Sequence, residues 1–209
     1  MNLSEGVLRW VVAAAAGLVL VSLVQGVVRS HRRPPGRTTA GAERVLRPGV
    51  ETLIGVGFLG VCIVLWSPLP FEPRDAARLS LDVAGAVLAF TGLGLVLWGR
   101  LTLGRLYGVS SALGAQLHGD HRLITHGPFA YTRHPMYLGI ETASLGGLLL
   151  YRTWTLVFLT VAFLGLLVRA RREDELLRLE FGAQWEAYRQ HVPGWLPRTR
   201  RTKPFHPRD

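Results

Sequence analysis

The chain has 209 residues, of which 49% are hydrophobic, and its formal net charge is +10. A mean hydropathy of +0.26 is high for a soluble protein of this charge, whereas apolar membrane spans separated by basic loops account for both values. Because the basic residues lie between long apolar runs, we do not interpret the pI of about 11.1 as a sign of nucleic-acid binding. Cys62 is the only cysteine, which excludes an intrachain disulfide and a cysteine metal site.

Three apolar stretches occupy the first half of the chain. Residues 7–28 are long enough to span a bilayer. A cleaved signal peptide is the alternative, but no small-residue cleavage site precedes the following arginine cluster, so we interpret this stretch as a retained span. Residues 50–66 form a second predicted span. Residues 79–103 contain a third, with Asp82 near one end and Arg100 near the other.

Two shorter apolar stretches, 136–150 and 155–168, follow in the second half. They are short for a core of about 30 Å at about 1.5 Å per residue, and only four residues join them, so we predict a tight antiparallel hairpin. Residues 169–191 predict an amphipathic tail helix that ends before Pro193. A solvated basic tail, 198–209, follows.

The expected fold is therefore an all-α integral membrane protein with about five transmembrane helices, a C-terminal hairpin and a cytoplasmic tail helix. We expect three parts: N-terminal spans (1–103), a region with the hairpin and the tail helix (104–197) and the basic tail (198–209). Strongly basic loops alternate with near-neutral ones, which predicts an N-terminus outside and a C-terminus in the cytoplasm. The near absence of lysine, with abundant alanine and glycine, is consistent with a bacterial inner-membrane protein.

A first polar cluster, residues 127–139, precedes the fourth span. Gly127 and Pro128 predict a turn. If a helix starts near His134, then His134, Tyr137 and Glu141 share one of its faces. A carboxylate within an apolar span usually has a partner or a task. The alternative is that the cluster only caps a helix and anchors it at the headgroup region.

A second polar cluster, residues 169–175, follows the fifth span. Arg169 and Glu173 are four residues apart and share one helical face. The alternative interpretation is a cytoplasmic stop signal followed by solvated ion pairs. No metal site is expected, because His118 and His121 are too sparse a set of ligands.

Together, the two clusters resemble the isoprenylcysteine carboxyl methyltransferase and phospholipid methyltransferase superfamily. The similar segments are residues 124–139, with the pattern R-H-P-x-Y-x-G, and residues 173–182, in which an acidic pair precedes F-G. The resemblance covers roughly residues 103–197. Two departures from the family pattern remove no essential chemical group: Asp174 stands where a second glutamate is usual and keeps the charge with a shorter reach, and Trp185 replaces a tyrosine.

The resemblance implies an S-adenosylmethionine pocket that faces the cytoplasm and takes a lipid or lipid-like substrate. By the resemblance, Arg169 lies next to the reacting centre. A carboxylate acceptor needs a cation to orient it, and Arg169 or Arg133 is the catalytic candidate for that role. The residues that the resemblance assigns to the cofactor are His121, Leu123, Gly127, Pro128, His134, Pro135, Tyr137, Glu173 and Asp174.

The acceptor stays open at this stage between a carboxylate and an amine. An ionised carboxylate needs no general base. An amine must lose a proton, and Glu141 is the candidate to accept it or to hold an ammonium group, beyond what the family pattern implies. The competing hypotheses are a phospholipid N-methyltransferase, an NADPH-dependent membrane reductase of the sterol-reductase type, and a non-catalytic membrane protein.

Overall fold

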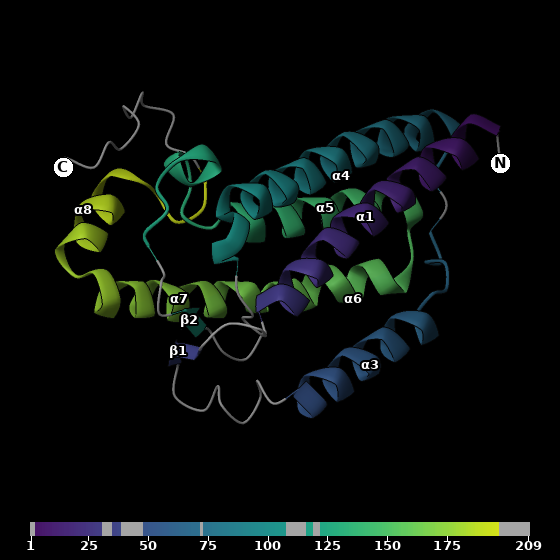
Figure 1. Cartoon of the computed structure of the whole chain (residues 1–209). Helices are drawn as coiled ribbons and strands as arrows, with labels where there is room; N and C mark the ends of the chain where they lie inside the picture. Colours follow the sequence, from purple (N-terminus) through teal and green to yellow (C-terminus); the bar gives the residue numbers. More distant parts are fainter. Residues whose placement is uncertain are drawn as a thin grey trace.

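The computed structural model describes residues 3–30, 35–38, 48–71, 73–107, 116–118 and 122–196. Its helices are α1 (Leu3–Ser30), α3 (Pro48–Val64), α4 (Asp75–Leu103), α5 (Pro135–Tyr151), α6 (Trp154–Phe163), α7 (Gly165–Phe181) and α8 (Ala183–His191) (Figure 1). Two 3-10 turns, η1 (Gly104–Leu106) and η2 (Gly127–Ala130), accompany them. Strands β1 (Pro35–Thr38) and β2 (Gln116–His118) pair antiparallel.

The described part of the chain is helical apart from that small sheet, as predicted. Among the described residues, three segments are long and apolar enough to cross a membrane: Gly6–Arg29, Ala77–Leu106 and Trp154–Phe181. They coincide with the first, third and fifth predicted spans. The other two predicted spans correspond to shorter helices, α3 with its apolar part Leu53–Val64 and α5 with 17 residues. Membrane crossing by these two helices stays a prediction.

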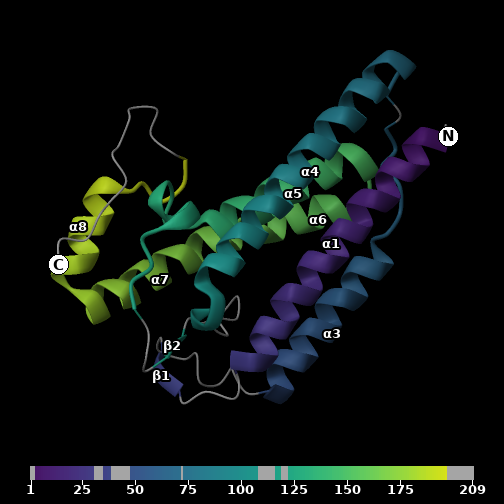
Figure 2. The same ribbon diagram turned by 45° about the horizontal axis from the view of Figure 1, so that its top comes forward.

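The predicted boundary between the fifth span and the tail is wrong in one respect. α6 and α7 follow each other through Leu164 alone, so the apolar segment and the polar cluster at 169–175 belong to one nearly continuous helical stretch. The predicted tail helix then divides at Gly182, whose φ of +47° lies in the region that glycine adopts most readily. α8 begins after this break, which turns the chain back towards the N-terminal end of α5 (Figures 1 and 2).

α4 and α5 form the central antiparallel pair, because small residues let their backbones approach closely. A Cβ placed on Gly92 would lie 2.5 Å from the carbonyl oxygen of Gly139, and one on Gly85 would lie 2.8 Å from that of Gly146. Gly85, Ala89 and Gly92 recur along one face of α4. Such rows of small residues are typical of helix packing within membranes, where no hydrophobic effect drives helices together.

Gly92→Ala should therefore destabilise the helix pair. The added methyl group collides with backbone atoms of α5, and overpacking of this kind costs about 1–3 kcal/mol. Gly94→Ala is the matched control, because a Cβ there meets nothing within 4 Å, and alanine has the higher helix propensity. Thermal unfolding in detergent should show a lower Tm for Gly92→Ala alone. Equal Tm values for both variants would contradict the close approach of the two helices.

α1 runs alongside α4 in both views (Figures 1 and 2). The Tyr151 hydroxyl donates to the carbonyl oxygen of Arg9 at 2.5 Å near one end of α1, and Arg100 Nε donates to that of Ser22 at 3.4 Å near the other. α3 contacts α6, where the rings of Phe58 and Phe158 are 5.5 Å apart.

A buried ion pair joins α4 to the α5–α6 connection, at the end of the bundle away from the polar clusters. Arg152 Nη2 donates to Asp82 Oδ1 at 2.5 Å, and the Asp82 side chain is 2% exposed. The carbonyl oxygen of Arg152 also accepts the backbone N–H of Leu69 at 2.7 Å. Asp82, near one end of the third predicted span, therefore has a structural partner there.

Candidate active site

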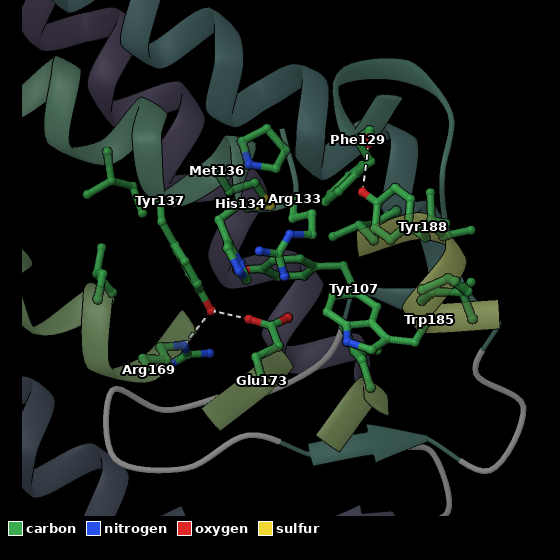
Figure 3. Close-up of a pocket in the computed structure, with 18 of the residues that line it drawn as sticks. Tyr107, Phe129, Arg133, His134, Met136, Tyr137, Arg169, Glu173, Trp185 and Tyr188 are labelled. Atoms are coloured by element: carbon green, nitrogen blue, oxygen red, sulfur yellow. Dashed lines mark hydrogen bonds between the residues drawn. The ribbon is translucent and has the colours of Figure 1, made fainter. Parts of the chain in front are cut away.

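The two polar clusters meet at one end of the α4–α5 pair, around a cavity of about 250 Å³ (Figure 3). Arg133, His134 and Tyr137 come from the entrance of α5, and Arg169 and Glu173 come from α7. The remaining walls are mainly apolar and aromatic: Leu23, Leu103, Leu106, Tyr107, Leu123, Ile124, Phe129, Pro135, Met136, Ile140, Leu166, Leu177, Trp185 and Tyr188. The predicted meeting of the two clusters is therefore present in the structure.

The Tyr137 hydroxyl connects the two charged residues of α7 that line the cavity. Arg169 Nε donates to this oxygen at 2.5 Å, and the hydroxyl donates to Glu173 Oε2 at 2.7 Å (Figure 3). One helical turn separates Arg169 from Glu173, so a single phenol reaches both. The Arg169 side chain, which belongs to a residue only 8% exposed, is thereby aligned along the cavity wall beside a carboxylate.

Asp174 holds the other two basic side chains of the site. Its Oδ2 accepts from Arg133 Nη1 at 2.5 Å, and its Oδ1 lies 2.9 Å from His134 Nε2. The Arg133 guanidinium also lies 5.4 Å from the centre of the Trp185 ring. One aspartate thus holds two neighbouring residues that precede α5, and its hydrogen bond with Arg133 is charge-assisted.

The chain after α8 returns to the same segment and braces it. The backbone N–H of Arg133 donates to the carbonyl oxygen of Pro193 at 2.9 Å, and the Thr132 hydroxyl donates to that of Gly194 at 3.0 Å. The Trp195 ring lies 5.5 Å from that of His134. These contacts hold His134, which is 6% exposed and lies just before α5 begins.

α8 covers one side of the cavity with two large aromatic residues. Trp185 and Tyr188 are 1% and 2% exposed, and the Tyr188 hydroxyl donates to the carbonyl oxygen of Phe129 at 2.6 Å. Burial raises the pKa of Tyr188 above its ordinary value. The hydroxyl therefore stays protonated at neutral pH and keeps its hydrogen bond to η2.

The other residues predicted for the site lie in different surroundings. Leu123 and Pro135 line the cavity, while Pro128 is fully buried beside it. Gly127 lines an adjacent groove at the start of η2. Glu141 lies one turn further along α5 than Tyr137, where Ile140 lines the cavity and Glu141 does not. His121 lies outside the described residues.

Three contributors to the site could not be assigned from the sequence pattern. Tyr107 follows η1 directly, Leu23 comes from α1, and Trp195 belongs to the returning segment. Proline and glycine before Trp195 do signal that the helix ends, but not where the chain goes next. The cavity consequently draws on α1, which lies outside the resemblance.

Comparison with known proteins identifies the region that carries these residues. Residues 86–179 match the isoprenylcysteine carboxyl methyltransferase (ICMT) family. A protein-S-isoprenylcysteine O-methyltransferase of Schizosaccharomyces pombe is 34% identical over 90 residues, which are 42% of this chain and 38% of that protein. Probable protein-S-isoprenylcysteine O-methyltransferases of Oryza sativa subsp. indica and japonica are 29% identical over 119 residues, 53% of this chain and 61% of theirs.

The chain thus spans between about two fifths and three fifths of the length of these relatives. The matched region contains η2, α5 and α6, and most of α7 with both polar clusters. The charged residues and the histidine that line the cavity therefore lie within the region that matches the family. Residues 86–179, slightly less than half of the chain, are thus similar to the isoprenylcysteine carboxyl methyltransferase family.

Proposed function

We propose that this protein is an S-adenosylmethionine-dependent membrane methyltransferase that methylates a carboxylate of a lipid-like acceptor. The observation that carries the proposal is that Arg169, Glu173, Arg133 and His134 line one shared cavity between apolar walls. Charged groups bind the polar parts of both ligands. The apolar walls accommodate a hydrocarbon chain and exclude water.

The residues present fit S-adenosylmethionine by their chemistry. Arg133 Nε is buried and has no hydrogen-bond partner among the described residues, so a carboxylate of the ligand would satisfy it. Glu173 offers an acceptor for ammonium or hydroxyl groups, and the aromatic side chains of the wall offer surfaces for an adenine ring. We assign Arg133, His134, Tyr137, Glu173 and, indirectly, Asp174 to this role.

When bound, S-adenosylmethionine supplies a methyl group on a sulfonium sulfur, from which an aligned nucleophile can displace it. The chain's own task is to hold the acceptor carboxylate in line and keep it unprotonated. Arg169 suits this task, because its guanidinium is always charged and Tyr137 fixes its orientation. No general base is needed for an acceptor that is already ionised.

Glu141 distinguishes this reaction from methylation of an amine, as in a phospholipid N-methyltransferase. Its Oε2 is buried and has no hydrogen-bond partner among the described residues, which is the one observation that favours a cationic acceptor. Glu141 nevertheless does not line the cavity. A catalytic role for Glu141 therefore requires the acceptor to extend out of the cavity, along α5, as far as Glu141.

For a carboxylate acceptor, we expect Glu141→Gln to keep turnover near the wild-type value across the pH range. Loss of a general base would instead lower turnover by about 10²–10⁴-fold and change the pH profile. The measurement is the pH dependence of labelled methyl transfer to an N-acetylated S-prenyl cysteine and to phosphatidylethanolamine. A large loss confined to the amine acceptor would favour the N-methyltransferase.

The proposal is tested first by calorimetric titration of the detergent-purified chain with S-adenosylmethionine, S-adenosylhomocysteine and NADPH. We expect binding of the two adenosyl compounds, and loss of that binding in His134→Ala. Binding of NADPH alone would replace the proposal with a membrane reductase. Failure of well-folded protein to bind any of the three would favour a non-catalytic protein.

We also propose that the site faces the cytoplasm, with the N-terminus outside. The described basic residues Arg29 and Arg105 lie at the ends of α1 and α4 that approach the site, whereas residues 67–71 contact the α5–α6 connection at the other end of the bundle. Protease treatment of sealed inverted membrane vesicles should remove the C-terminal tail. Protection of the tail from the protease would instead indicate the opposite orientation, with the C-terminus outside.

A further inference from the structure

A second hollow, of about 740 Å³, lies next to the cavity. It runs between the C-terminal end of α4, continued by η1, and the segment 122–131 that leads through η2, and we call it the basic groove. Leu103, Leu106, Leu123 and Ile124 line both the groove and the cavity, so they give the groove an apolar floor.

The charged side chains among the described residues that line the basic groove are all basic. Arg105, Arg122 and His126 line it and are exposed. Among the described residues that line the groove, none is acidic. An anion bound over the apolar floor would therefore meet two permanent positive charges.

Two aromatic side chains mark the rim of the basic groove. Trp98 and Tyr131 are 48% and 57% exposed, and their rings lie 6.5 Å apart. Trp98, Thr102 and Arg105 follow one another at i, i+4 and i+7, so an apolar-to-basic gradient runs along one face towards the end of α4. That end coincides with the end of the candidate span Ala77–Leu106, the level at which tryptophan and tyrosine contact lipid headgroups.

We propose that the basic groove binds one anionic phospholipid from the surrounding leaflet. Its phosphate lies against Arg105 and Arg122, and an acyl chain lies against Trp98 and the apolar floor. Charge complementarity selects an anionic over a zwitterionic headgroup. The floor and the aromatic rim distinguish a lipid from a soluble anion, which needs only the charges.

The test is native mass spectrometry of the full chain in detergent, titrated with phosphatidylglycerol or with phosphatidylcholine of the same acyl chains. We expect the wild type to retain one phosphatidylglycerol preferentially. The double variant Arg105→Gln/Arg122→Gln should lose about tenfold or more of that preference. Arg171→Gln/Arg189→Gln is the matched control, since it removes two exposed basic residues outside the groove and should keep the preference.

A second measurement does not depend on the folding of the arginine variants. Phosphatidylglycerol with brominated acyl chains should quench the tryptophan fluorescence of the wild type more than that of Trp98→Phe, at ratios where brominated phosphatidylcholine does not distinguish them. Three results would overturn the proposal: equal loss of preference in the control, displacement of the lipid by inorganic phosphate at equal concentration, or displacement by S-adenosylhomocysteine. The last would make the groove part of the cofactor site.

Discussion

Arg169→Gln should lower kcat for methyl transfer to an N-acetylated S-prenyl cysteine by about 10²–10³-fold, with little change in stability. Removing one preorganised charged donor from a water-excluded site has effects of this size. Glutamine keeps a side-chain N–H for Tyr137 but has neither the positive charge nor the planar fork of arginine. The measurement is kcat and KM for labelled methyl transfer, together with the Tm of each variant.

Arg171→Gln is the control for this prediction, because Arg171 lies two residues further along α7 and is exposed. Arg169→Lys adds a second comparison: it restores the charge without the fork, so we expect an activity between those of wild type and Arg169→Gln. If Arg169→Gln raised KM for the acceptor and left kcat unchanged, Arg169 would contribute to ground-state binding rather than to the transition state. Equal activities of Arg169→Gln, Arg169→Lys and Arg171→Gln would show that Arg169 has no role in the reaction.

The convergence of the two clusters could be predicted from the sequence because it depends on local geometry. About one helical turn separates His134 from Tyr137, and about one turn also separates Arg169 from Glu173. The short α5–α6 connection makes α5 an antiparallel neighbour of the stretch formed by α6 and α7. These spacings allow the Tyr137 hydroxyl to accept a hydrogen bond from Arg169 and to donate one to Glu173.

Other parts of the site depend on long-range packing that no periodic pattern encodes. Trp195 reaches His134 only because Gly182 breaks the tail and α8 turns back. Leu23 reaches the cavity because α1 packs beside α4, where a Cβ on Gly26 would lie 2.5 Å from the Tyr107 ring. The contact of α1 with the site therefore depends on Gly26, which has no side chain. The apolar composition of α1 does not predict this contact.

The acidic pair Glu173 and Asp174 has one feature that the sequence predicts and one that it does not. The sequence predicts that Asp174 keeps the charge of the glutamate usual in the family while shortening its reach. It does not predict that the shorter side chain contacts both Arg133 and His134, because that contact requires the braced segment before α5. Glu175, next in sequence, faces solvent and pairs only locally with Arg178 at 2.7 Å.

Asp174→Asn should weaken binding of S-adenosylmethionine by about 10–100-fold. The amide has almost the same size, but it replaces a carboxylate that holds two basic residues, and hydrogen bonds to charged groups contribute about 1.5–3 kcal/mol each. Arg133 and His134 would then lose the orientation that we assign to cofactor binding. The measurement is the calorimetric Kd for S-adenosylmethionine, with Tm recorded for the same samples.

Glu175→Gln is the adjacent control and should leave the Kd unchanged, because the Glu175 side chain is 55% exposed and contacts neither basic residue of the site. Asp174→Glu tests the role of charge separately: it restores the carboxylate with a longer reach, so we expect recovery of most of the affinity. A Kd that rose equally in Asp174→Asn and Asp174→Glu would show that exact reach, rather than charge, orients the two basic residues. Unchanged affinity in Asp174→Asn would separate this ion-pair cluster from cofactor binding and leave it a structural contact between α5 and α7.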